Sequence, residues 1–181
     1  MAEQDGADAV CIMGLEGAGL KNPATLTTLV SIAMAVRRVE IPLIAAGGIG
    51  NARTFLAALA LGAEAVLLRT VFCAVRESPL SEHHKQALVE VDPYDPKWRK
   101  PILATPKPEA MERLKQAKDS KAVHKAARQA ERFRLSRLAG IDTASLAIGF
   151  IDKVVAAKEL IDGIIGKTEE ILTSSGIGGR G

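Results

Sequence analysis

Two glycines, Gly47 and Gly48, follow directly on the apolar run 41–46, and a segment with a helical pattern begins at Asn51. Glycine lets backbone N–H groups approach an anion closely, and the start of a helix adds a partial positive charge. A second apolar run ends in Arg69 and Thr70, about twenty residues further on. Two such strand ends predict a phosphate site like the one that (β/α)8 barrels often form after their last two strands. The alternative is that the glycines only permit a tight turn.

A glycine-rich loop at residues 14–22 follows an apolar run that reads as a buried strand. It is expected on the same edge of the sheet as the Gly47-Gly48 turn, where it either closes over a cofactor or simply connects a strand to a helix. His83 and His84 are neighbours, so they point to different sides of a helix and are poor joint metal ligands. No metal-ligand spacing and no nucleophile elbow is found, and no metal site is predicted.

The basic charge is concentrated in one segment. Residues 97–137 carry thirteen Lys and Arg against four Asp and Glu, whereas the whole chain has a net charge of only +3. The segment could bind nucleic acid or an anionic membrane. Because aromatic residues are nearly absent from it, we favour a solvated helical face, and we expect neither a nucleic-acid nor a membrane partner. A salt-dependent basic interaction module remains an alternative.

The remaining composition is that of a globular α/β chain. No apolar run reaches the ~18 residues of a membrane-spanning helix, and the N-terminus lacks the basic start of a signal peptide. Cys11 and Cys73 lie in apolar segments and are expected to be buried thiols in a reducing compartment, which predicts a cytoplasmic location.

Periodicity predicts three βα units that form a parallel sheet. Strands are expected at 8–13, 43–46 and 65–68, and helices at 25–39, 52–61 and 154–172. The predicted organisation is a barrel-like region at 1–90, a Pro-rich connection with a basic helical insertion at 91–140, a C-terminal helical region at 141–173 and a disordered tail at 174–181.

Four stretches resemble the nitronate monooxygenase family, formerly called 2-nitropropane dioxygenase, to which FMN-dependent enoyl-ACP reductases are close relatives. The stretches are residues 6–10, 14–19, 41–49 and 57–66, and a later segment, 147–160, is similar to the C-terminal end of the family. The resemblance implies the C-terminal portion, about strands 6–8, of a flavin-binding (β/α)8 TIM barrel that carries a charged helical insertion.

The resemblance also implies roles for particular residues. Gly47 and Gly48 would hold the FMN phosphate through their backbone N–H groups, Arg69 and Thr70 would complete that site, and Gly19 would lie near the flavin ring. The implied activity is that of an FMN flavoprotein oxidoreductase, a monooxygenase that oxidises alkyl nitronates with O2. The flavin supplies the redox chemistry, and the protein orients a small-molecule substrate.

Three departures from the family pattern bear on that expectation. Leu20 stands where the family has the histidine presumed to be the base, so no catalytic residue is identified. Arg69 replaces a glycine, and it either adds charge to a phosphate or crowds it. Strands 1–5 have no counterpart, which suggests a fragment, a truncated product or a chain completed by a homo-oligomer or by a missing N-terminal half. The alternatives to the enzyme are therefore an impaired barrel that acts as a binding or scaffold protein, or an enoyl-thioester reductase-like enzyme.

Overall fold

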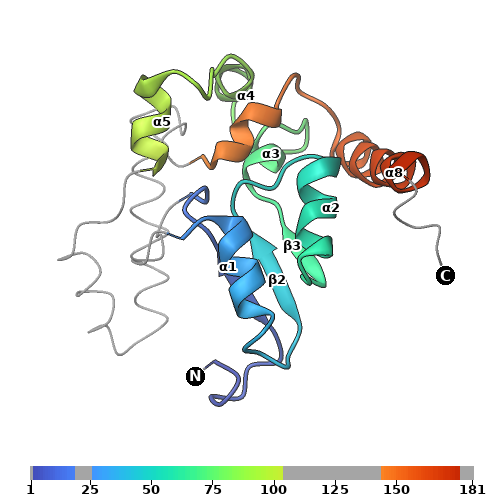
Figure 1. The fold of residues 1–181 in the computed structure, drawn as a ribbon. Coiled ribbons are helices and arrows are strands. Elements are labelled where there is room, and N and C mark those ends of the chain that lie inside the picture. Colours follow the sequence, from blue (N-terminus) through green and yellow to red (C-terminus); the bar gives the residue numbers. More distant parts are fainter. Residues whose placement is uncertain (1, 19–25, 104–143, 176–181) are drawn as a thin grey trace.

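In the computed structural model, which describes residues 2–18, 26–103 and 144–175, three parallel strands form one sheet in the order β1-β2-β3 (Figure 1). The strands are short and are joined by helical crossovers. In chain order the elements are β1 (Val10–Met13), α1 (Thr28–Ala35), β2 (Leu43–Ala46), α2 (Ala52–Ala60) and β3 (Ala65–Leu67). The three predicted βα units are therefore confirmed, and the two crossover helices, α1 and α2, are shorter than the ranges predicted for them.

The two faces of the sheet have different surroundings. In the parallel register Ile12 pairs with Ala45, which pairs with Val66, and these residues pack toward a core under the crossover helices. The buried centre of that core comprises Ile32, Leu43, Ala45, Ile49, Ala58 and Ala63. On the opposite face Cys11 is exposed and Leu67 keeps 51% of its surface accessible. Cys11 was predicted to be buried, and that was wrong, because its strand position points away from the helices.

A second core lies beyond the carboxyl ends of the strands. It is built by α3 (Thr70–Cys73), α4 (Glu82–Val89) and the 3-10 helix η2 (Leu146–Phe150). Its buried residues are Val71, Ala74, Leu88, Val91, Ala144, Ala147, Ile148 and Ile151. A segment late in the chain thus packs directly on the residues that follow β3, as the short orange helix beside α3 shows (Figure 1).

The helix α5 (Pro96–Leu103) lies within the predicted Pro-rich connection. Asp95 starts it, because Oδ1 of this residue accepts the N–H of Lys97 at 2.8 Å. Proline is well tolerated in the first turn of a helix, where its missing N–H would have no helical partner. Pro96 therefore marks a helix start within the segment that was predicted as a connection. The predicted charged helices of the basic insertion, from residue 108 to 138, lie outside the described residues.

The last helix, α8 (Ala157–Ser175), lies against α2 (Figure 1). Its start is joined to the end of α3 by a parallel bridge between Val75 and Val155. Because α8 continues to Ser175, the first two residues of the predicted disordered tail are helical, which corrects that boundary. The rest of the tail lies outside the described residues. None of the helices in the described ranges is long and apolar enough to cross a membrane.

Glu77 caps the first turn of α8. Its Oε2 accepts the backbone N–H of Ala157 at 2.9 Å, and this hydrogen bond lowers the pKa of the Glu77 carboxyl below its ordinary value. A carboxylate near a helix start also interacts favourably with the helix dipole. The interaction ties α8 to the segment after α3, across eighty residues of sequence.

We expect Glu77→Gln to lower the melting temperature at pH 7, because it removes the charge from this cap. A carboxyl whose folded-state pKa is lowered stabilises the fold above its unfolded-state pKa, and this contribution is lost as the pH falls through the folded-state pKa. The difference from the unmodified chain should therefore narrow below about pH 4. Thermal unfolding followed by circular dichroism at pH 7 and pH 3 tests this. Glu64→Gln, at an exposed turn residue, is the control, and equal differences at both pH values would contradict the prediction.

Candidate cofactor site

The turn after β2 has the backbone that the glycine pair predicts. Gly47 has φ of 91° and Gly48 has φ of 72°, both in the left-handed region that favours glycine. A Cβ at Gly48 would lie 2.9 Å from Cβ of Glu16, and one at Gly47 would lie 3.0 Å from the backbone nitrogen of Gly17. The turn therefore packs closely on the loop that follows β1.

Some backbone N–H groups of this turn already donate a hydrogen bond within the protein, and others do not. The N–H groups of Gly50 and Asn51 both donate to Oγ1 of Thr54, at 3.1 and 3.2 Å. Asn51 in turn caps α2 by accepting the N–H of Thr54 at 3.0 Å. Within the described ranges, the N–H of Gly48 has no acceptor in hydrogen-bonding position. The N–H of Gly47 also lacks an acceptor in the described ranges, so a bound anion would find its donors at Gly47 and Gly48 and not at the residues that begin the helix.

Thr70 follows β3 and is 4% exposed. Its Oγ1 accepts the backbone N–H of Ser145 at 2.9 Å and the hydroxyl of Ser145 at 2.8 Å. Oγ of Ser145 also accepts the N–H of Ala147 at 3.2 Å. The two hydroxyls carry two protons, of which their mutual bond uses one. The Thr70 proton has no acceptor in the described part of the chain, so this buried pair offers one O–H donor.

The glycine turn and the end of β3 lie at the same edge of the sheet, because Ala46 pairs with Leu67 in the parallel register. Packing brings them together with η2. A Cβ at Gly50 would lie 2.8 Å from Cγ1 of Val71 and 3.1 Å from Cβ of Ala147. We call this junction of the β1 loop, the glycine turn, the start of α3 and the start of η2 the glycine corner.

The structure places the other predicted site residues in different ways. The Arg69 side chain is exposed, at the residue that precedes α3. Its charge acts on Cys73: burial raises the pKa of the Cys73 thiol, and the Arg69 guanidinium opposes that rise. Gly19 and Leu20 lie outside the described residues. Among the described residues, no group of three His, Cys, Asp or Glu side chains is placed to hold a metal ion.

Two parts of the glycine corner were not predicted from the sequence. Ser145 stands directly before an apolar segment, which is the position of a helix-capping serine, and that signal could have indicated η2. Its contact with Thr70 spans 75 residues, and no local pattern indicates it. Glu16 also bonds residues of two distant segments. Its Oε2 accepts the N–H of Thr28 at 2.7 Å, and its backbone O accepts the N–H of Leu146 at 2.9 Å.

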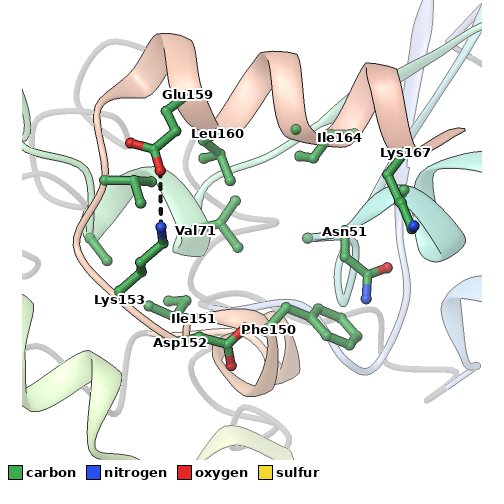
Figure 2. A pocket seen from close by; sticks show the side chains of 15 residues that line it. Asn51, Val71, Phe150, Ile151, Asp152, Lys153, Glu159, Leu160, Ile164 and Lys167 are labelled. Carbon is green, nitrogen blue, oxygen red and sulfur yellow. Dashed lines mark hydrogen bonds and ion pairs between the residues drawn. The ribbon is translucent and has the colours of Figure 1, made fainter.

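A separate pocket of 290 Å³ lies between the start of α2, η2 and α8 (Figure 2). Val71, Ile151, Leu160 and Ile164 supply apolar walls, and the ion pair of Lys153 with Glu159, at 3.1 Å, lies at one end. Neither Gly48 nor Thr70 lines this pocket. The pocket therefore does not include the residues that supply the hydrogen-bond donors of the glycine corner.

The donor set of the glycine corner fits a phosphate. A phosphate dianion accepts hydrogen bonds, and the corner offers the N–H of Gly48 and the spare hydroxyl proton of the Thr70–Ser145 pair. The carboxylate of Glu16, whose side chain packs against Gly48, is already bonded to the N–H of Thr28. Glycine at both turn positions permits the positive φ values that this turn requires.

Comparisons with known proteins identify a family. The family model described as nitronate monooxygenase matches residues 1–166. A nitronate monooxygenase of Pseudomonas aeruginosa is 36% identical over 95 residues, which are 49% of this chain and 27% of that protein. A (3aS,4S,5R,7aS)-5-hydroxy-7a-methyl-1-oxo-octahydro-1H-indene-4-carboxyl-CoA dehydrogenase of Rhodococcus jostii is 40% identical over 80 residues, 44% of this chain and 22% of that protein. The matches thus span about a quarter of these curated relatives.

Solved structures extend the likeness to nearly the whole chain. FabK from Thermotoga maritima has a TM-score of 0.72 at 29% identity and covers 96% of this chain, which corresponds to 58% of FabK. A nitroalkane oxidase from Streptomyces ansochromogenes has a TM-score of 0.62 at 23% identity, covering 95% of this chain and 55% of its own, and shows the shared fold alone. Together with the parallel βα units, these likenesses confirm the predicted fold class, an α/β portion of a (β/α)8 barrel.

Proposed function

The chain belongs to the nitronate monooxygenase family. We therefore propose that its glycine corner binds the phosphate of FMN and that the chain forms all or part of a flavin-dependent oxidoreductase. The observation that carries this proposal is the Gly47-Gly48 turn, whose two positive φ values accompany an N–H at Gly48 without an acceptor in the described structure. The O–H donor of the Thr70–Ser145 pair supplies a second contact from the neighbouring strand end.

The protein's part in this function is binding and orientation. FMN, when bound, supplies the redox chemistry. The N–H of Gly48 and the hydroxyl of Thr70 would hold the phosphate, with the Arg69 charge nearby in sequence, and the Gly19 loop would lie toward the flavin ring. Fixing the phosphate holds the cofactor in one position, which lowers the entropic cost of presenting it to a substrate.

For the reaction we propose oxidation of alkyl nitronates with O2, as the family resemblance implies. One residue favours a second candidate. Leu20 stands at the position of the family histidine and cannot accept a proton, so a chain that binds FMN without turnover is the alternative. An enoyl-thioester reductase-like activity is a third outcome that the same assays distinguish.

We expect the chain to bind FMN at least about tenfold more tightly than riboflavin, which lacks the phosphate, because hydrogen bonds to a charged group contribute about 1.5–3 kcal/mol. Titration followed by the quenching of flavin fluorescence measures both affinities. Inorganic phosphate should compete with FMN and leave riboflavin binding unchanged. Equal affinities for the two flavins, or no binding of either, would contradict the proposed site.

Turnover is measured separately on the FMN-loaded chain. Oxygen uptake with an alkyl nitronate supports the monooxygenase reaction, and nicotinamide oxidation with an enoyl thioester supports the reductase. FMN binding with neither activity supports the binding or scaffold candidate.

A further inference from the structure

Thr28, the first residue of α1, connects that helix to the glycine turn. Its side chain is 8% exposed, and its Oγ1 lies 2.8 Å from the carbonyl oxygen of Gly47. The same hydroxyl lies 2.9 Å from Oε2 of Glu16 and 3.5 Å from the carbonyl oxygen of Ala46. The hydroxyl has a single proton, which these acceptors share. The contact with Gly47 is the shortest of the three and joins residues nineteen positions apart.

This bond fixes the orientation of one peptide group. The carbonyl of Gly47 and the N–H of Gly48 belong to the same planar trans unit, so they point in opposite directions. With the carbonyl held toward Thr28, the N–H of Gly48 points away from α1. A glycine-glycine peptide has little intrinsic preference for its orientation, so an external contact is needed to select one.

Glu16 holds Thr28 in place. Its Oε2 accepts the backbone N–H of Thr28 at 2.7 Å, which fixes the first turn of α1 against the loop after β1. Gly14 makes the approach possible, because a Cβ there would lie 2.1 Å from the nitrogen of Thr28. Glu16 and Gly14, both in the loop after β1, thus position Thr28 so that its hydroxyl contacts the carbonyl of Gly47.

We propose that Thr28 is a positioning residue for the cofactor phosphate, because its hydroxyl holds the Gly47 carbonyl and thereby directs the N–H of Gly48 toward the bound anion. The inference rests on the proposed FMN site. Thr28 itself would not touch the phosphate. Its loss should therefore weaken the recognition of a phosphate without removing the flavin site.

The test compares Thr28→Val with the unmodified chain in titrations with FMN and with riboflavin. Valine keeps the volume and removes the hydroxyl, so the affinity for FMN should fall about tenfold while that for riboflavin stays within twofold. Thr28→Ser restores a hydroxyl and should recover FMN binding to within threefold. Thr168→Val is the matched control, since Thr168 is 6% exposed and its hydroxyl bonds only within α8, to the carbonyl of Ile164 at 2.7 Å.

Each outcome has a separate meaning. If the unmodified chain binds no FMN, the proposed function fails. Two results would overturn the positioning role of Thr28 in a chain that binds FMN. One is an unchanged FMN affinity in Thr28→Val, and the other is a loss of riboflavin affinity as large as the loss of FMN affinity. Thr28→Cys covers the case in which Thr28→Val does not fold, because a thiol is a weaker donor of similar size. It should weaken FMN binding selectively but less than tenfold, and unchanged selectivity would overturn the proposal.

Discussion

Gly48→Ala is expected to lower the affinity for FMN by about 10–100-fold, which corresponds to the loss of one hydrogen bond to a charged group. A Cβ at this residue would lie 2.9 Å from Cβ of Glu16, and the φ of 72° disfavours any side chain. Relief of both strains rotates the peptide that carries the N–H of Gly48. Titration with FMN, alongside thermal unfolding, measures the effect.

Gly62→Ala is the matched control for Gly48→Ala. Gly62 has φ of 100°, and a Cβ there would lie 2.6 Å from Cγ2 of Val36, so it shares both the backbone strain and the crowding. It ends α2 at the far end from the glycine corner, and we expect it to lower the melting temperature while FMN affinity stays within threefold. Equal FMN affinities in the two variants would show that the glycine turn does not bind the phosphate.

Gly14→Ala is expected to cause the largest loss of stability, about 3 kcal/mol of unfolding free energy. The added Cβ would lie 2.1 Å from the backbone nitrogen of Thr28 and 2.3 Å from its Cα. Backbone atoms cannot move aside as a flexible side chain can, so α1 and the β1 loop must separate. That separation would also break the bond between Glu16 and Thr28.

Gly163→Ala makes the same chemical change where there is space for it. Gly163 lies inside α8, and, apart from its chain neighbours and the backbone of its own helix, no atom of the described structure lies within 4 Å of a Cβ built there. We expect a gain of about 0.5–1 kcal/mol, because alanine loses less conformational entropy in a helix than glycine does. Chemical denaturation measures the change in unfolding free energy, which should be a loss for Gly14→Ala and a gain for Gly163→Ala. A Gly14→Ala variant as stable as Gly163→Ala would refute the steric account.

The elements with regular patterns could be predicted from the sequence. The run 43–46 was placed correctly as β2, and Asn51 with Thr54 marks the start of α2. Several short elements were missed, η2 among them. The helix α3 has only four residues, too few for a periodic signal, and in α5 the prolines suggested a connection although Asp95 and Pro96 are ordinary helix-start residues.

At the candidate site, too, local features could be predicted from the sequence, whereas contacts between distant segments could not. The conformation of Gly47 and Gly48 could be predicted, because two glycines after a buried strand indicate a turn with positive φ. The partners of Thr70 and Gly47 could not. Ser145 and Thr28 reach the corner through tertiary packing, and the sequence shows only a serine before an apolar segment and one of several threonines.

The bonds that join the glycine corner also set an order of events during synthesis. Thr70 can bond Ser145 only after a further 75 residues have been synthesised, and Glu16 can bond Leu146 only at about the same time. Translation adds about 5–20 residues per second, so several seconds separate the emergence of the sheet from that of the segment that closes the corner. Contacts so distant along the chain form slowly, because the loop between them must first be closed. The segments of the sheet and the glycine turn are therefore synthesised before the proposed anion site is complete, and the FMN of the proposed function would find its full set of donors only after residue 146 has been made.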